Sequence, residues 1–202
     1  DGLARMNKQT GTCQDATSLL QGNLNAGKPK VSCIIEDKNK NLWVGTYGSG
    51  LYKINLPTQH VTYYESTRNE NDDWSINRLP NDWISYLLED KEGMIWIGTY
   101  KGLAVLNPQT DNFINYKKQN NLLPGYVVYS LLESSNGEIW AGTSEGLVCL
   151  NKDRLTPVLF TTADGLPSDI ICGLAEDEKK NIWISTCLLY TSPSPRDRSV
   201  SR

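Results

Sequence analysis

Hydrophobic residues in this chain come in short runs that alternate with clusters of turn-forming residues. The β-rich runs "VSCIIED", "ISYLLED" and "VYSLLES" each lead through a polar turn into "LWVGT", "IWIGT" or "IWAGT". A turn that contains glycine follows, and then "GLYKIN", "GLAVLN" or "GLVCLN". The last run of each unit is "HVTYYE", "NFINYK" or "PVLFTT". Each unit therefore predicts four short antiparallel strands.

The unit recurs along the chain around a tryptophan. Successive anchors, Trp43, Trp96, Trp140 and Trp183, are separated by 53, 44 and 43 residues. Three kinds of residue stand at a fixed spacing from each of these tryptophans. A β-branched residue lies twelve positions before it (Val31, Ile84, Val128, Ile171), and a glutamate lies seven positions before it (Glu36, Glu89, Glu133, Glu176). A threonine lies three positions after it (Thr46, Thr99, Thr143, Thr186). Glycines stand two residues after the first three anchors and open the third strands: Gly45, Gly98, Gly142, Gly50, Gly102 and Gly146. Because "GLARMN" near the start aligns with "GLAVLN", the chain begins inside an earlier copy.

Four antiparallel strands every 40 to 45 residues or so are typical of a β-propeller blade. The predicted fold class is all-β, a partial β-propeller forming an open arc of about four blades of four-stranded antiparallel sheets. Residues 31–66, 84–117 and 128–162 are predicted complete blades, 1–30 the end of a preceding blade and its connection, and 171–186 the start of a further blade. An open arc leaves two apolar faces unmatched, so we expect the isolated chain to be poorly soluble or to aggregate.

The repeated residues have predicted structural roles. Glycine after each tryptophan removes a Cβ where adjacent sheets approach closely, and the tryptophan supplies apolar area between blades. The glutamate recurs at the same place in every blade, whereas a catalytic group is unique to its site. We therefore expect the glutamates to make structural hydrogen bonds.

Composition excludes several function classes. The 202 residues are 39% hydrophobic and 21% charged with net charge −3, which is typical of a soluble globular protein and not of a nucleic-acid partner. No apolar run approaches the roughly 20 residues that span a bilayer. Five cysteines without CxxC spacing and a single histidine predict no metal site, and nothing indicates a cofactor. The cysteines are interpreted as small buried hydrophobes.

The pattern W-x-G-T-x-x-G-L-x-x-L-N, with "RLP" at 78–80, "LLP" at 122–124 and "GLP" at 165–167, resembles the two-component regulator propeller repeat. The resemblance extends to Thr186. It implies the periplasmic sensor region of a hybrid two-component histidine kinase of the Bacteroidetes type, where two seven-bladed propellers and an immunoglobulin-like domain precede a membrane helix. It further implies a homodimeric receptor, further blades of the same propeller and a membrane link only through other segments. Kinase activity would lie downstream, so this segment is expected not to be an enzyme.

The fourth copy departs from the pattern after "NIWIST". Where "GLxxLN" should follow, the chain reads "CLLYTSPSPRDRSVSR". "CLLYTSPSPRD" resembles the translated mosaic-end adapter of transposase-based sequencing libraries. Residues 187–202 are therefore expected to be a non-native or disordered tail, which would leave four natural cysteines.

Candidate ligand-binding residues lie in the turns between the second and third strands and in the blade-to-blade connections, which share one face of a propeller. The candidates are Tyr47, Tyr100, Lys101 and Glu145 in the turns, and Arg68, Trp74, Arg78, Asn81 and Trp83 in the long first connection. Tryptophan faces stack on sugar rings while polar groups take the hydroxyls. The alternative is that Trp74 and Trp83 only fasten the loop to the blades.

Three functions compete. The leading hypothesis is a sensor that binds a small ligand, an oligosaccharide, and signals to transcription. The first alternative is a propeller scaffold for protein–protein interaction. The second is a propeller lyase or glycosidase, which is disfavoured because a glycosidase needs two unique carboxylates facing each other, and the acids here are repeated or lie in turns. We therefore predict no catalytic residues.

Overall fold

The computed structural model describes residues 2–20, 29–66, 78–116, 123, 127–151 and 157–187. Three four-stranded antiparallel sheets follow one another along the chain. Their strands are β3 (Val31–Glu36), β4 (Asn41–Thr46), β5 (Leu51–Asn55) and β6 (Val61–Tyr64); β7 (Ile84–Glu89), β8 (Ile95–Thr99), β9 (Gly102–Asn107) and β10 (Asn112–Tyr116); and β11 (Val128–Glu133), β12 (Ile139–Thr143), β13 (Gly146–Leu150) and β14 (Pro157–Phe160). Two-stranded sheets flank them, formed by β1 (Ala4–Met6) with β2 (Cys13–Asp15) and by β15 (Ile171–Glu176) with β16 (Ile182–Thr186). Short 3₁₀ turns are η1 (Thr17–Leu20) and η3 (Thr162–Asp164).

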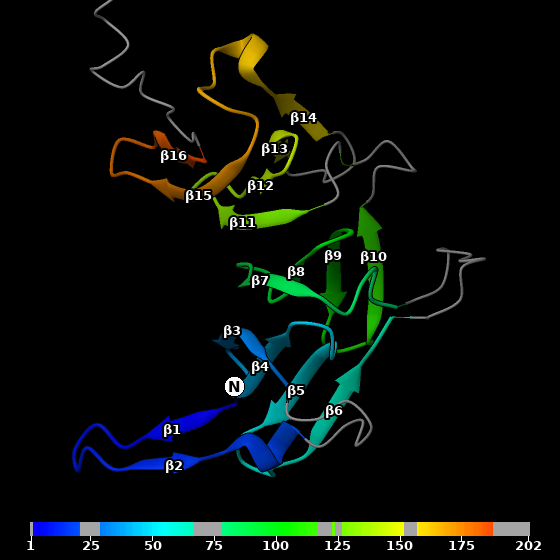
Figure 1. Cartoon of the computed structure of the whole chain (residues 1–202), viewed down its shortest axis with the longest axis vertical. Helices are drawn as coiled ribbons and strands as arrows, with labels where there is room; N and C mark the ends of the chain where they lie inside the picture. Colours follow the sequence, from blue (N-terminus) through cyan, green and yellow to red (C-terminus); the bar gives the residue numbers. More distant parts are fainter. Residues whose placement is uncertain are drawn as a thin grey trace, which may run out of the picture.

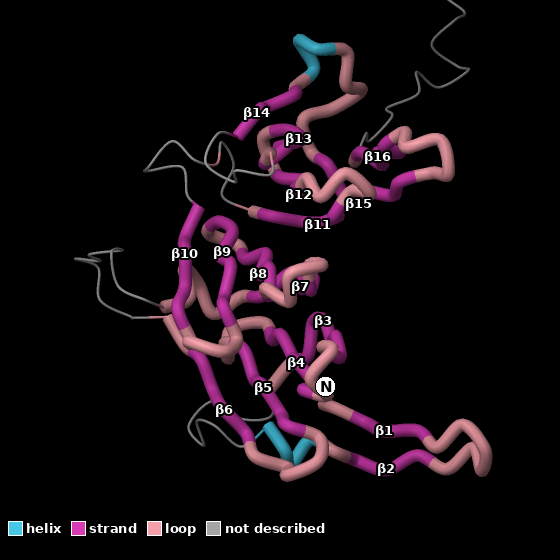
Figure 2. Tube along the Cα trace, turned by 180° about the vertical axis from the view of Figure 1, so that it is seen from behind, coloured by secondary structure: helices cyan, strands magenta, loops and turns pink. Residues whose placement is uncertain are grey.

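The sheets stack in an open arc, with the β1–β2 hairpin at one end and β15–β16 at the other (Figure 1). The first strands of successive sheets, β3, β7, β11 and β15, are neighbours, whereas β6 and β10 lie on the other side of the stack (Figure 2). The predicted fold class, an open partial propeller of four-stranded sheets, is confirmed. None of the helices in the described ranges is long and apolar enough to cross a membrane.

Every first strand carries the same irregularity. The register against the second strand shifts between Val31 and Cys33, and equivalent shifts follow Ile84, Val128 and Ile171. An extra residue on one strand increases the local twist. The bulge therefore increases the twist of each first strand, which is the strand that neighbours the first strand of the next sheet.

The glycines after the tryptophans mark the closest approach of adjacent sheets. A Cβ placed on Gly45 would lie 2.7 Å from Ile84 Cγ2 in the next sheet. The same construction gives 3.0 Å from Gly98 to Val128 Cγ1 and 2.8 Å from Gly142 to Ile171 Cγ2. The β-branched residue that opens each blade thus packs on the glycine of the blade before it, and the predicted role of these glycines is confirmed.

The repeated tryptophans fill the space between sheets as far as a neighbouring sheet exists. Trp43 and Trp96 are 0% exposed, and each belongs to an apolar cluster that includes residues of the following sheet. Each of the first three tryptophans stacks on the aromatic residue of its own outer strand, namely Tyr64, Tyr116 and Phe160. The expectation of buried area fails for Trp183, which is 66% exposed because no other sheet in the described part of the chain covers β16.

A repeated aspartate holds the indole. Trp43 Nε1 donates to Asp37 Oδ2 at 2.8 Å, and the same bond joins Trp96 to Asp90 at 2.7 Å and Trp183 to Asp177 at 3.0 Å. In the third sheet Ser134 replaces the aspartate, and Trp140 Nε1 lies 3.4 Å from Glu138 Oε2. The sequence interpretation missed this pair.

The repeated glutamates connect successive sheets. Glu89 accepts hydrogen bonds from the backbone N–H of Lys38 in the preceding sheet at 3.1 and 3.2 Å. Glu133 accepts from Lys91 N–H at 2.9 Å, and Glu176 accepts from Ser135 N–H at 2.6 Å. The predicted structural role is confirmed for these three. Glu36, in the first sheet, pairs instead with Lys40 at 3.1 Å.

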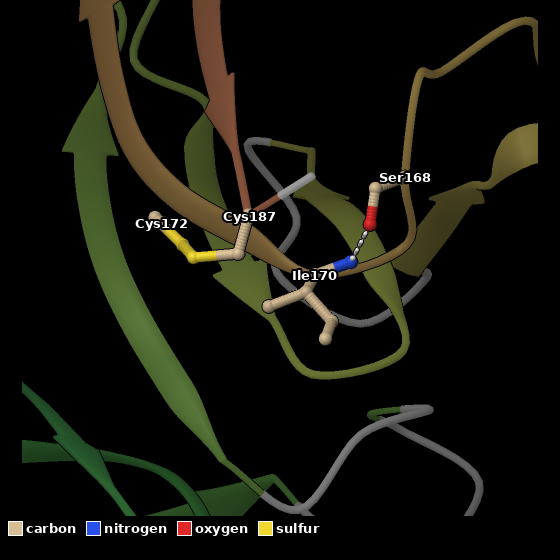
Figure 3. The surroundings of a disulfide bond; sticks show 4 residues. All are labelled: Ser168, Ile170, Cys172 and Cys187. Atoms are coloured by element: carbon tan, nitrogen blue, oxygen red, sulfur yellow. Dashed lines mark hydrogen bonds between the residues drawn. A yellow bond between two sulfur atoms is a disulfide. The ribbon is translucent and has the colours of Figure 1, made fainter. Parts of the chain in front are cut away.

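Only one of the five cysteines is buried as predicted. Cys149 is buried, whereas Cys33 is half-buried and Cys13 is exposed, because β2 has no neighbouring sheet on its outer side among the described residues. Cys172 on β15 forms a disulfide with Cys187 at the end of β16 (Figure 3). Cys187 N–H donates to Ile170 O at 3.1 Å, and Ile170 N–H donates to Ser168 Oγ at 3.2 Å. Residues 188–202 lie outside the described residues.

Candidate functional site

Three of the predicted ligand-binding residues form an exposed aromatic cluster, Tyr47–Trp83–Tyr100. The ring centroids of Trp83 and Tyr100 are 5.6 Å apart, and Tyr47 lies 6.2 Å from Trp83 and 6.3 Å from Tyr100. The side chains are 42%, 50% and 38% exposed for Tyr47, Trp83 and Tyr100. Three aromatic rings therefore present a continuous apolar surface to solvent at the junction of the first two sheets.

Backbone hydrogen bonds fix the cluster in place. Tyr47 forms a β-bridge with Trp83, and Tyr100 N–H donates to Trp83 O at 3.1 Å. The turn of the first sheet is attached to the second because the N–H groups of Gly48 and Gly50 both donate to Asp82 O at 3.1 Å. Gly48 has φ of 89°, and a Cβ on it would lie 3.2 Å from Trp83 Nε1. A side chain at this position would strain the turn and press on the indole.

The connection that leads into Trp83 is held by its own side chains. Asn81 Oδ1 accepts from Trp83 N–H at 3.0 Å, and Asp82 Oδ1 accepts from Ser66 N–H at 2.6 Å. Asn81, predicted as a ligand contact, thus positions the indole through the backbone. Trp83 remains half exposed, so the indole is not buried as a plug under the loop.

Tyr100 is linked electrostatically to its aromatic neighbours. Burial raises the pKa of Tyr100, and the negative charges that Tyr47 and Tyr129 would carry raise it further. The phenol therefore stays neutral at physiological pH and can donate a hydrogen bond. Beside it Lys101 is exposed, and its backbone N–H donates to Thr99 Oγ1 at 3.1 Å. Charged residues thus neighbour the cluster along the chain: Lys101 follows Tyr100, and Asp82 precedes Trp83.

The remaining candidates are not part of the cluster. Glu145 occupies the place of Lys101 in the third sheet, where Ser144 and Val127 replace the aromatic pair and make the same backbone bond at 3.0 Å. Arg78 is exposed, and its carbonyl accepts from Asn115 Nδ2 of the outer strand β10 at 3.0 Å. Arg68 and Trp74 lie outside the described residues.

No sign of a metal centre accompanies the cluster. Within the described ranges, no group of three or more histidine, cysteine, aspartate or glutamate side chains could hold a metal ion. The three rings of the cluster can offer aromatic stacking and hydrogen bonds from the phenol and indole groups.

Comparison with known proteins identifies the repeats. Residues 27–48, 78–101 and 122–145 match the family model "Two component regulator propeller". These segments each contain a first strand, a second strand and the start of the turn that carries Tyr47, Tyr100 or Glu145. No curated protein sequence matches the chain.

Solved structures share the fold. The extracellular domain of a hybrid two component system from B. thetaiotaomicron matches with TM-score 0.73 and 25% identity over 90% of this chain. A second such domain from the same organism has TM-score 0.70 and 23% identity over 92% of the chain. The chain spans 23% and 24% of these two domains. Virginiamycin B lyase from Staphylococcus aureus matches in fold alone, with TM-score 0.58 and 15% identity over 82% of this chain and 52% of the lyase.

The four-stranded sheets, their repeated tryptophans and glycines, and the three matched segments lead to one assignment. The chain is an open β-propeller segment that carries two component regulator propeller repeats.

Proposed function

We propose that the chain is part of the extracytoplasmic sensor propeller of a hybrid two-component histidine kinase, and that the Tyr47–Trp83–Tyr100 cluster contacts its ligand. The repeats and the extracellular domains of similar fold support the sensor assignment. The periplasm is the compartment that follows for a Gram-negative host. The proposed ligand site rests on one observation: three aromatic rings that contact one another are exposed where the first two sheets meet.

An oligosaccharide is the ligand class that this surface fits best. Rings that are 38–50% exposed offer faces on which the C–H-rich side of a sugar can stack. Indole N–H, neutral phenols and the Lys101 ammonium can donate to hydroxyl oxygens around it. A strongly anionic ligand would instead call for several cations, and Lys101 is the only one carried by the two turns that hold Tyr47 and Tyr100.

Binding would act by shifting a population. A ligand that bridges the first two sheets at their junction favours one arrangement of the receptor dimer over another only if it binds the two with different affinity. The output to transcription would run through segments outside this chain. For this segment we propose no catalytic role, because Glu89, Glu133 and Glu176 are each occupied by a backbone N–H of the neighbouring sheet.

The test is titration calorimetry of the chain with a panel of neutral oligosaccharides. We expect saturable heat with at least one glycan and a loss of affinity of about tenfold or more in Trp83→Ala, since removal of a stacked aromatic commonly exceeds 1 kcal/mol. Ile114→Ala is the control, because this apolar side chain is 56% exposed on the outer strand β10. Equal loss in both variants would point to non-specific contact.

Other outcomes identify the alternatives. Consumption of the glycan would make the propeller an enzyme. Absence of any glycan heat, together with a protein ligand whose binding depends on Trp83, would make the cluster a protein-interaction surface and the chain a scaffold.

A further inference from the structure

A polar pocket lies on the first sheet, away from the aromatic cluster. It has a volume of about 370 Å³, at the small end of the range for ligand pockets, and the side chains that line it are all polar: Asn41, Lys53, Asn55, Thr58, His60 and Thr62. None of these residues is acidic. Asn41 begins β4, whereas Tyr47 follows the end of β4, so the pocket and the cluster lie at opposite ends of this strand.

Strand pairing directs the pocket toward the second sheet. Lys53 lies opposite Trp43 on one side and opposite Thr62 on the other, and residues that pair across strands share one face of a sheet. Trp43 packs in an apolar cluster with residues of the second sheet. The pocket is therefore part of the junction between two complete sheets.

The polar lining departs from the repeat. The other two complete sheets have apolar residues at the positions of Lys53 and Thr62, namely Val105, Ile114, Cys149 and Val158. Packing between sheets therefore does not require an ammonium group or a hydroxyl at these positions. A departure of this kind on a repeated framework indicates a role other than packing.

The amide oxygens of the pocket are already engaged within the protein. Asn41 Oδ1 accepts a hydrogen bond from Asn55 Nδ2 at 3.0 Å. Asn55 Oδ1 accepts from the backbone N–H and the hydroxyl of Thr58, at 3.0 and 2.7 Å. Asn41 Nδ2 donates in turn to Asp37 Oδ2 at 2.8 Å. The network therefore uses the acceptors and leaves the pocket rich in donors.

Several of those donors remain available to a ligand. Lys53 Nζ donates to Pro108 O of the second sheet at 3.0 Å, and the rest of its ammonium N–H groups have no other acceptor in the described structure. Asn55 Nδ2 has a second N–H beside the one that bonds to Asn41. The hydroxyl of Thr62 makes no hydrogen bond with the described residues, and the imidazole of His60 is exposed at the rim.

Lysines that only join sheets are bonded more completely. Lys38 Nζ donates to the carbonyl oxygens of both Asp90 and Lys91, at 3.0 and 2.9 Å, and Lys91 Nζ donates to two carbonyls of the third sheet at 3.0 and 3.2 Å. Lys53 is half-buried, makes one such bond and has no salt bridge to a carboxylate of the described residues. A partly desolvated ammonium group of this kind is stabilised by an anion.

We propose that this pocket binds a tetrahedral oxyanion, phosphate or sulfate, through the Lys53 ammonium group, with Asn55 Nδ2, the Thr62 hydroxyl and the His60 ring around it. A ligand made of oxygen acceptors fits a pocket that offers donors, and the absence of carboxylates from the lining removes the main source of repulsion. The site is separate from the proposed sensor surface and does not rest on it.

Titration calorimetry with sodium phosphate tests the site, with the ionic strength held constant by sodium chloride. We expect saturable binding by the wild type and affinity about tenfold lower or less in Lys53→Met, because the charge-assisted hydrogen bond is lost while an unbranched side chain still covers Trp43. Lys179→Met is the matched control, since it removes the same charge from an exposed lysine outside the pocket. Circular dichroism confirms that each variant is folded.

A second variant keeps the test decisive where Lys53→Met does not fold. Thr62→Val preserves the shape of the side chain and removes its donor, and the third sheet already has Val158 at this place. We expect this variant to bind phosphate about threefold more weakly or worse while its thermal melting without phosphate is unchanged.

The same group occurs as a free ion and as an ester on a larger molecule. Methyl phosphate separates the two sources: binding at least as tight as that of inorganic phosphate supports an ester ligand, and weaker binding supports the free ion. Sulfate should compete with phosphate in either case. Absence of saturable binding, equal affinity in the wild type and Thr62→Val, or an equal loss in Lys53→Met and Lys179→Met would each overturn the proposal.

Discussion

Trp96 Nε1 donates a hydrogen bond of 2.7 Å to Asp90 Oδ2, and both residues are almost completely buried. Asp90 also accepts from Met94 N–H at 2.8 Å, so one carboxylate closes the β7–β8 turn and fixes the indole that packs between sheets. In the third sheet the equivalent Trp140 Nε1 reaches only Glu138 Oε2, at 3.4 Å. Trp96 and Trp140 therefore have the same place in their sheets, but the hydrogen bond of the Trp96 indole is shorter and more deeply buried.

This difference predicts unequal effects of Trp96→Phe and Trp140→Phe. The first change leaves a buried carboxylate without its indole donor, and we expect it to lower the free energy of unfolding by about 1–3 kcal/mol beyond the loss of apolar volume. Trp140→Phe removes a longer, half-buried hydrogen bond and should lower the free energy of unfolding by a smaller amount. Urea unfolding of both variants at one protein concentration measures the difference, and equal losses would contradict the assignment.

The sequence predicted the interior of the arc because its determinants repeat. A small residue facing a β-branched residue, an indole between sheets and a glutamate reaching the preceding turn each recur at fixed spacing, so one observation supports the others. The Asp37–Trp43 pair went unnoticed because aspartate is common in turns and Ser134 interrupts the series.

The candidate site was predictable only in part. Tyr47 and Tyr100 were placed on one face by the position of their turns, but their contact with Trp83 depends on a β-bridge between residues of different sheets. The long connection before Trp83 has no counterpart in the other repeats, so the repeat pattern could not predict this bridge. The Cys172–Cys187 disulfide was likewise beyond prediction, because the pairing of cysteines does not follow from their spacing.

The contact between Gly45 and Ile84 predicts that alanine will be tolerated unequally at the repeated glycines. Gly45→Ala would bring a Cβ within 2.7 Å of Ile84, whereas Gly98→Ala would approach Val128 at 3.0 Å. We expect Gly45→Ala to lower the free energy of unfolding by about 1–3 kcal/mol, and Gly98→Ala to lower it less.

A double variant isolates the cause. Ile84→Ala removes Cγ2, the atom that a Cβ on Gly45 would meet at 2.7 Å, so the added effect of Gly45→Ala should be smaller in an Ile84→Ala background than in the wild type. The comparison is a double-mutant cycle measured by urea unfolding. Strict additivity of the two changes would show that the Gly45 effect arises elsewhere, for example against Cys33 Sγ.

Asp37 predicts an acid-sensitive component of stability. Burial alone would raise the pKa of Asp37, but hydrogen bonds from Asn41, from the Trp43 indole and from backbone N–H groups outweigh it and lower the pKa. A carboxyl with a lower pKa in the folded state stabilises the fold above its unfolded pKa of about 3.9, and this stabilisation is lost as pH falls through the folded value. We expect Asp37→Asn to be less stable at pH 7 and to lose less stability between about pH 5 and pH 3. Thermal melts across this range measure both slopes, and parallel slopes would exclude Asp37 as the source.

The residues after Thr186 yield a prediction about the gene. In the first three copies a strand beginning Gly-Leu follows the turn after the threonine, and β16 presents an edge on which such a strand would pair. Because "CLLYTSPSPRD" resembles translated adapter sequence, we expect genomic DNA amplified outward from the repeat to encode a Gly-Leu strand beyond Thr186 in its place. Cys172 would then lack the partner that it has in this chain, and its thiol should react with alkylating reagents in the natural protein. Genomic DNA that encodes "CLLYTSPSPRD" would show that the tail is natural and that the Cys172–Cys187 disulfide belongs to the protein's own fold.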